Sequence, residues 1–240
     1  MTMQKFGLCA AIVLTSACSE ARDGIGEAKA QALAPGPIVV ELFQSQGCSS
    51  CPPANANVNA LAAARSDVLA LSYAVTYWDK LGWKDTFAQP AFTERQRAYR
   101  RSGQSDGVYT PQVVINGRKA LVGANRGSLN SAIAGIGPLR GGPAIVRDAA
   151  GVTIGAGQGG PATVLVVTYD PRVRAVPVKA GENGGRTLPH RNIVIGLREA
   201  GVWNGKALHV AVNAPKDPAL RTAVLLQKGA GGPLLAATRL

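Results

Sequence analysis

Two cysteines, Cys48 and Cys51, have the C-x-x-C spacing at which neighbouring thiols can bond to each other. At the start of a helix, unpaired N–H groups and the positive end of the helix dipole favour the thiolate of the first cysteine. A thiolate attacks disulfides, and a second thiol two residues further along resolves the mixed disulfide intramolecularly. The pair therefore predicts thiol–disulfide exchange, with Cys48 as attacking thiolate and Cys51 as resolving thiol.

The same spacing also fits an inert structural disulfide or half of a zinc site. The remaining cysteines, Cys9 and Cys18, are near the N-terminus, and His190 and His209 are the only histidines. A four-ligand zinc site is therefore short of partners, and we predict neither a metal nor a cofactor. Two alternatives to the oxidoreductase stay open. One is a non-catalytic envelope binding protein with a structural disulfide, and the weaker one is a metallochaperone that uses both thiolates.

The elements around the cysteines follow a strand, helix, strand order. An apolar run at 38–43 predicts a strand, prolines after the cysteines suit the first turn of a helix over 48–65, and the run at 68–76 is typical of a parallel strand buried on both faces. A second helix starts at Pro90, and Asn116-Gly117 is a strong hairpin signal. The predicted order is βαβαββα, completed by strands at 112–115 and 119–123 and a helix that ends before 137–138.

From Gly141 the sequence changes to short strands separated by turns. This spacing favours a small β-sandwich. We place a domain boundary at 141–143, between an α/β domain at 38–140 and a mostly β region at 141–240. In the alternative arrangement, the last strands extend the first sheet.

Several residues are expected at the same sheet edge as the cysteines. Thr110 and Pro111 open a strand that runs antiparallel to the first one, and a cis peptide there would hold the backbone ready to pair with an extended substrate. Trp78, Asp79 and Trp83 follow a strand parallel to the first. We predict substrate binding for these five residues. The alternative for the tryptophans and the aspartate is a structural role in the local core.

The first residues have the pattern of a targeting segment. Lys5 precedes an apolar run at 6–17 that is too short to span a bilayer, and the run leads through small residues into Cys18. We predict a signal peptide at 1–17, lipidation of Cys18 and a tether at 18–37, which anchor the protein to a bacterial envelope membrane. Plain secretion, with cleavage near 32–34, is the alternative.

The composition limits the possible partners. The 240 residues include 26 Lys and Arg against 14 Asp and Glu, a net charge of +12 that is spread along the chain. Because no basic motif interleaved with aromatic residues is found, we expect no nucleic acid as partner. An exported basic protein meets anionic lipid or envelope polymer instead. The expected partners are protein thiols or disulfides in the periplasmic envelope, including an unidentified redox partner, and the membrane itself.

The order of elements, with the C-x-x-C helix, Thr-Pro and the Asn-Gly hairpin, resembles the thioredoxin fold. More narrowly, the chain resembles an uncharacterised bacterial family of exported thioredoxin-like proteins. The motifs that carry this resemblance are Glu41 to Pro53, Tyr77 to Asp85, Arg95 to Tyr99, Gly181 to Gly184 and His190 to Asn192. The family has no established reaction, so the resemblance implies a fold and a redox site rather than an activity.

The resemblance also draws attention to Glu41, which the apolar run places inside the first strand. It resembles the buried acid that assists proton transfer in thioredoxins, although the turn between it and the cysteines is one residue longer here. A proton-transfer role is therefore one prediction for Glu41. A structural ion pair is the other, because a desolvated carboxylate is stabilised by a nearby cation.

Overall fold

The computed structural model describes residues 1–2 and 35–240. The expected signal peptide, Cys18 and most of the tether therefore lie outside the described residues. Among the described residues, no helix is long and apolar enough to cross a membrane.

The N-terminal half has the order of elements that the sequence predicts. The elements are β1 (Ile38–Gln44), α1 (Cys51–Ala64), β2 (Val68–Ala74), α2 (Pro90–Arg101), β3 (Gln112–Ile115), β4 (Lys119–Leu121) and α3 (Arg126–Ile136). The hairpin between β3 and β4 turns at Asn116 and Gly117, whose φ angles are +50° and +60°. Asparagine and glycine adopt positive φ most readily, so this dipeptide produces the turn.

Strand β1 is buried on both faces and organises this half of the molecule. It pairs with β2 in parallel and with β3 in antiparallel orientation. Val40 and Leu42 pack with residues of α1 and α3, whereas Val39 and Phe43 pack with aromatic residues of α2 and with strands of the C-terminal half. Since successive side chains of a strand point to opposite faces, the two helix layers lie on opposite sides of the sheet.

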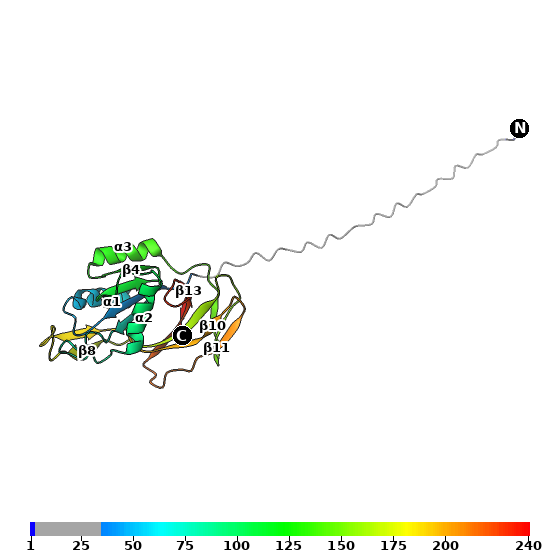
Figure 1. Ribbon diagram of the computed structural model, residues 1–240. Helices are drawn as coiled ribbons and strands as arrows, with labels where there is room; N and C mark the ends of the chain where they lie inside the picture. Colours follow the sequence, from blue (N-terminus) through cyan, green and yellow to red (C-terminus); the bar gives the residue numbers. More distant parts are fainter. Residues whose placement is uncertain (3–34) are drawn as a thin grey trace. The chain divides into compact units, whose positions relative to one another are not determined.

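The C-terminal half is built from nine strands. They are β5 (Ile145–Arg147), β6 (Gly151–Ile154), β7 (Ala162–Asp170), β8 (Arg174–Pro177), β9 (Thr187–His190), β10 (Ile193–Trp203), β11 (Leu208–Ala211), β12 (Arg221–Lys228) and β13 (Leu234–Arg239). Four of them continue the first sheet, whose order is β13-β12-β7-β10-β2-β1-β3-β4. The described residues thus form a mixed α/β fold with one large mixed sheet and few helices (Figure 1).

The sandwich expected for residues 141–240 does not stand apart from the first sheet. Strand β10 runs parallel to β2, with Ile193 opposite Ser72, and this pairing joins the two halves into one sheet. The last strands therefore take the alternative arrangement and extend the first sheet. A sandwich-like part remains, because a small sheet of β11, β6 and β5 packs on β7, β10, β12 and β13 around the buried Trp203.

Strands β8 and β9 form a separate hairpin that lies against α1. They pair with each other, and two side chains of α1 hold β9. The Nδ2 atoms of Asn55 and Asn59 donate to the Pro189 carbonyl at 3.2 and 2.9 Å. Figure 1 shows β8 at the same end of the molecule as α1. The turn of this hairpin consequently lies near the cysteine pair.

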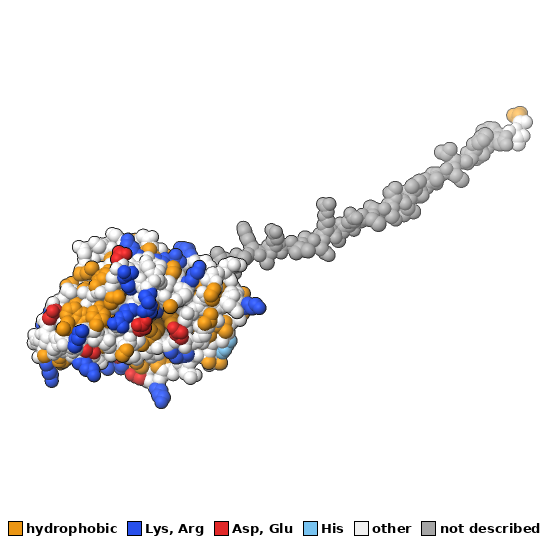
Figure 2. Space-filling view, viewed as in Figure 1, with side chains coloured by type: hydrophobic (Ala, Val, Ile, Leu, Met, Phe, Trp, Pro, Cys, Tyr) orange, Lys and Arg blue, Asp and Glu red, His pale blue; other side chains and the backbone are white. Residues whose placement is uncertain are grey.

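On the face shown in Figure 2, positive charge is not gathered into one patch. Figure 2 shows Lys and Arg side chains scattered over the visible face, with hydrophobic side chains between them. Several of the cations form ion pairs with carboxylates, such as Arg172 with Asp170 at 2.8 Å.

Candidate functional site

Cys48 and Cys51 are joined by a disulfide, with their Cα atoms 5.4 Å apart. Both are buried, with 0% and 2% of their surface exposed, although the two intervening serines are exposed. The cysteine loop, residues 44–50, turns tightly between β1 and α1. The Cys48 N–H donates to the Ser45 carbonyl at 3.1 Å, and the Cys51 N–H donates to the Cys48 carbonyl at 3.2 Å.

The helix starts three residues later than the sequence predicts. Helix α1 begins at Cys51, so Cys48 lies in the loop before it. Pro52 and Pro53 follow directly, and neither has an N–H group to offer to a thiolate. The hydroxyl of Ser50, 3.3 Å from the Cys48 sulfur, is instead the polar group that the structure places against it.

Thr110 and Pro111 lie beside the cysteine pair, joined by a cis peptide bond as the sequence predicts. The Ser50 hydroxyl donates to the Thr110 carbonyl at 3.5 Å, which links the Thr110–Pro111 loop to the start of α1. The indole N–H of Trp78 donates to the Thr110 hydroxyl at 2.7 Å. Three of the predicted substrate-binding residues are therefore brought together with the cysteines.

Trp83 and Asp79 support the cysteine loop through two further residues. The Trp83 indole N–H donates to Gln46 Oε1 at 2.9 Å. The carboxylate of Asp85 accepts the Gln46 backbone N–H at 2.7 Å, and Asp79 accepts the Asp85 N–H at 3.1 Å. Burial raises the pKa of Asp85 to about 6, while hydrogen bonds from backbone N–H groups act in the opposite direction. Gln46 and Asp85 were not predicted as site residues, although both fall within the motifs that carry the family resemblance.

The turn between β8 and β9 covers the cysteine loop, a contact that sequence reasoning misses. Asn183, fully buried, donates from Nδ2 to the carbonyls of Gln46 and Cys48 at 2.8 and 2.9 Å. Glu182 accepts the backbone N–H of Ser49 at 3.0 Å and its hydroxyl at 2.7 Å. These two bonds lower the pKa of Glu182. The one signal in the sequence is the Gly181-to-Gly184 motif.

Comparisons with known proteins agree with this architecture. Residues 39–227 match the family described as "Protein of unknown function (DUF1223)". The chain belongs to this family. The X-ray structure of a structural-genomics target from Agrobacterium tumefaciens is 35% identical, with a TM-score of 0.69 over 87% of this chain and 96% of that chain. HBP35 of Porphyromonas gingivalis, 11% identical, shares the fold alone, with a TM-score of 0.57 over 88% and 76% of the two chains. No curated protein gives a significant match.

Glu41 lies apart from this site, on the face of the sheet that packs against α2. Its carboxylate, 0% exposed, accepts two hydrogen bonds from Arg95, at 2.6 and 2.9 Å, and one from the Tyr99 hydroxyl. Helix α1 packs on the opposite face. The ion pair is therefore the role that the contacts of Glu41 support, and they give no link to the cysteines for proton transfer.

His190 is buried at the end of β9, next to α1. Its Nδ1 atom lies 2.9 Å from Asn55 Nδ2, and burial lowers the pKa of His190 to about 4. The neutral ring is thus a hydrogen-bonding partner of α1. Within residues 1–2 and 35–240, no three side chains of His, Cys, Asp or Glu gather in a way that suits a metal ion.

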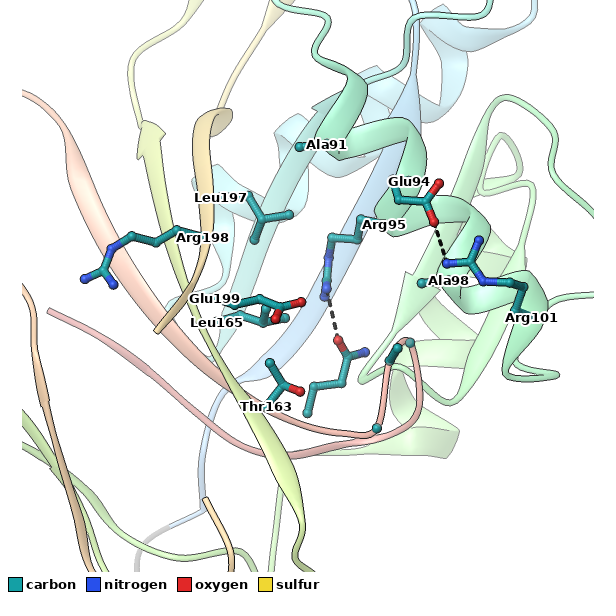
Figure 3. Close-up of a pocket in the computed structure, with 14 residues that line it drawn as sticks. Ala91, Glu94, Arg95, Ala98, Arg101, Thr163, Leu165, Leu197, Arg198 and Glu199 are labelled. Atoms are coloured by element: carbon teal, nitrogen blue, oxygen red, sulfur yellow. Dashed lines mark hydrogen bonds and ion pairs between the residues drawn. The ribbon is translucent and has the colours of Figure 1, made fainter. Parts of the chain in front are cut away.

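A pocket of about 380 Å³ lies on the α2 side of the sheet, between α2 and strands β7, β10 and β12. Figure 3 shows Arg95 and Glu199 pointing into it, while Arg198 points away. The Arg95 guanidinium in its wall also donates to Gln227 at 3.0 Å. Because Arg95 already neutralises Glu41, its charge in the pocket is largely satisfied from within the protein.

Proposed function

We propose that this chain is an exported thiol–disulfide oxidoreductase with a thioredoxin-like N-terminal half, which exchanges disulfides with proteins of the bacterial envelope. The observation that carries the proposal is the Cys48–Cys51 disulfide at the junction of β1, α1 and the Thr110–Pro111 loop. Hydrogen-bond donors and acceptors surround the cysteines there, whereas a purely structural disulfide needs only packing.

In the proposed exchange, a dithiol of the partner protein supplies the two electrons that reduce the Cys48–Cys51 disulfide. A partner thiolate attacks the Cys48 sulfur, the bond to Cys51 breaks, and Cys51 leaves as a thiolate that takes up a proton. The second partner thiolate then attacks the partner sulfur of the mixed disulfide and releases Cys48. Two electrons pass from the partner to Cys48 and Cys51, the partner gains a disulfide, and the two thiols of this protein gain the protons. The reverse sequence reduces a partner disulfide.

The neighbouring side chains have defined roles in this proposal. When the Cys48 thiolate forms, the Ser50 hydroxyl rotates from the Thr110 carbonyl and donates to the thiolate, because a hydrogen bond to the charged form favours it. The Thr110–Pro111 loop orients the partner, and Trp78 holds Thr110 in place. Trp83 and Asp79 act indirectly, through Gln46 and Asp85, as positioning residues for the cysteine loop.

A second candidate function is favoured by one observation, the burial of both sulfurs. A disulfide that solvent does not reach suits a structural bond in a non-catalytic binding protein. The two functions differ in reduction potential, since structural disulfides of secreted proteins typically lie below about −300 mV.

The deciding experiment measures insulin reduction and the reduction potential of the purified protein. We expect wild-type protein to turn over insulin in the presence of dithiothreitol, Cys48→Ser to be inactive, and Cys51→Ser to accumulate a mixed disulfide with its partner. Ser66→Ala is a matched control, since Ser66 lies in the turn after α1, at the end of the helix away from the cysteines. A potential below about −300 mV, together with insulin turnover equal in wild type and Cys48→Ser, would assign the pair to the structural alternative.

The envelope location rests on the sequence pattern that ends at Cys18. We propose lipidation at Cys18, with membrane attachment through this lipid. Labelled fatty acid should enter the wild-type chain and not Cys18→Ala. Equal incorporation in both would refute lipidation at Cys18, and no incorporation in either would favour secretion without an anchor.

A further inference from the structure

The turn between β8 and β9, residues 178–186, contacts the cysteine loop at three residues, Gln46, Cys48 and Ser49. Asn183 donates to the carbonyls of Gln46 and Cys48, and Glu182 accepts from the N–H and the hydroxyl of Ser49. We refer to residues 178–186 as the Glu182 turn. Its four hydrogen bonds lie directly over the loop that carries Cys48.

The Glu182 turn keeps its own shape without these contacts. The Gly185 and Val178 backbones bond across its base, with Gly185 N to Val178 O at 2.8 Å, and Arg186 holds the Asn183 side chain at 2.6 Å. Gly181 has a φ of +71°, a conformation that glycine adopts without steric cost. The strands below the turn pair with each other and not with the large sheet. The turn is therefore a preformed unit that is attached to α1 through β9 and not to the large sheet.

The position of the Glu182 turn conflicts with thiol–disulfide exchange at Cys48 and Cys51. An attacking thiolate must reach a sulfur of the disulfide. Cys48 is 0% exposed, although its neighbours Ser49 and Ser50 are exposed and the loop lies at the surface. In this arrangement, with the Glu182 turn bonded to the backbone on both sides of Cys48, neither cysteine is open to attack.

We propose that the Glu182 turn is a lid over the disulfide, and that an extended peptide of the redox partner displaces it. This inference rests on the proposed function. The lid presents an acceptor to the Ser49 N–H and a donor to the Cys48 carbonyl. An extended peptide backbone offers one acceptor and one donor at each residue, so it replaces both contacts when the lid opens. Glu182 and Asn183 thus compete with the partner for the same groups.

The first test measures how fast dithiothreitol reduces the disulfide in the full chain, with alkylation and mass spectrometry as readout. Dithiothreitol supplies the two electrons and closes into its own cyclic disulfide, so no protein partner is needed. Because the rate follows the open fraction of the lid, we expect it to rise about ten-fold in Glu182→Ala and in Asn183→Ala, and less in Glu182→Gln. Glu199→Ala and Asn204→Ala, exposed residues away from the turn, are the matched controls and should react like wild type.

The effect of the Glu182 charge on the rate must be separated from the effect of lid opening, because removal of Glu182 also removes its repulsion of the attacking thiolate. Repulsion is screened in about 1 M salt, where the Debye length is about 3 Å, whereas lid opening is not. A rate increase that persists in high salt, and that Asn183→Ala shares, supports the lid. Rates within two-fold of wild type in a folded Glu182→Ala, or an increase that disappears in high salt, overturn it. If a thermal melt shows that Asn183→Ala is unfolded, the rates of the Glu182 variants alone decide whether the lid exists.

The second test uses a synthetic unstructured decapeptide with one central cysteine. Competition with the lid predicts that the peptide concentration giving half-maximal exchange falls about ten-fold in Glu182→Ala. An unchanged value overturns displacement by an extended peptide. Failure of the proposed function is distinguishable, because insulin turnover independent of Cys48 refutes that function while the dithiothreitol rates still report on the lid.

Discussion

Two buried titratable groups, Asp85 against the cysteine loop and His190 against α1, should change the stability of the fold in opposite directions when they titrate. Asp85 accepts the backbone N–H groups of Gln46 and Phe87 at 2.7 and 2.8 Å, and burial raises its pKa from 3.8 to about 6. His190 lies against Asn55, and burial lowers its pKa from 6.5 to about 4. Both shifts disfavour the charged form, which is an anion in one case and a cation in the other.

For Asp85, the folded protein keeps the proton up to about pH 6, while the unfolded chain loses it near 3.8. The stability that this proton contributes is therefore complete below 3.8 and is lost as the pH rises through about 6. At about 1.4 kcal/mol for each pH unit, the interval corresponds to about 3 kcal/mol.

For His190, the unfolded chain takes up a proton near pH 6.5 and the folded protein near 4. Its contribution is present above 6.5 and is lost as the pH falls toward 4. The interval again corresponds to about 3 kcal/mol. Between about pH 4 and 6 the two contributions nearly cancel in the wild type, so single variants are needed to reveal them.

The assay is the free energy of unfolding in urea, measured from about pH 3.5 to 7 for wild type, Asp85→Asn and His190→Gln. Hydrogen bonds lost in a variant shift its curve by a constant, so the change with pH is the observable. Relative to wild type, the stability of Asp85→Asn should rise by about 3 kcal/mol across this range, and that of His190→Gln should fall by about 3 kcal/mol. Difference curves that are flat to within about 1 kcal/mol would refute the assigned burial effects.

Three further variants test other contacts. Arg95→Met leaves the buried Glu41 carboxylate unpaired and should destabilise the protein by about 3–5 kcal/mol, or about 6–20 °C in Tm. The double variant Arg95→Met with Glu41→Gln should regain more than half of this lost stability. Strictly additive effects of the two substitutions would argue against the ion pair. Ser50→Ala should move the alkylation pH profile of reduced Cys48 upward by about one pH unit, and an unchanged profile contradicts the hydrogen bond to the thiolate. Trp78→Phe should slow insulin turnover about five-fold while the disulfide still forms, and wild-type turnover would remove its positioning role.

Local signals in the sequence account for most of the N-terminal half. The buried run at β1, the proline start of α2 and the Asn116–Gly117 turn each act over a few residues, so a single sequence reveals them. The start of α1 was placed too early because proline at two successive positions is compatible with a helix that begins at either cysteine. The order of the elements also accounts for the pairing of Cys48 with Cys51 and for the position of Thr110–Pro111 beside them.

Long-range contacts account for what sequence reasoning misses. Ser49 and Glu182 are 133 residues apart, and neither side chain belongs to a periodic pattern that points to the other. The pairing of β10 with β2 joins Ile193 to Ser72 across a similar separation. The resemblance to thioredoxins links Glu41 to proton transfer at the cysteines, but the alternation of side chains along β1 directs it to α2 instead.

The strength of the contacts made by the Glu182 turn bears on its purpose. Glu182 and Ser49 are both exposed, so water weakens their two hydrogen bonds without removing their contribution. Asn183, by contrast, is fully buried and donates to two carbonyls of the loop, those of Gln46 and Cys48. The turn is thus held firmly enough to cover Cys48 and weakly enough, at Glu182, to be displaced at modest cost. A permanent cover would need no exposed carboxylate at its edge, whereas a lid that a peptide replaces requires contacts that the peptide can reproduce.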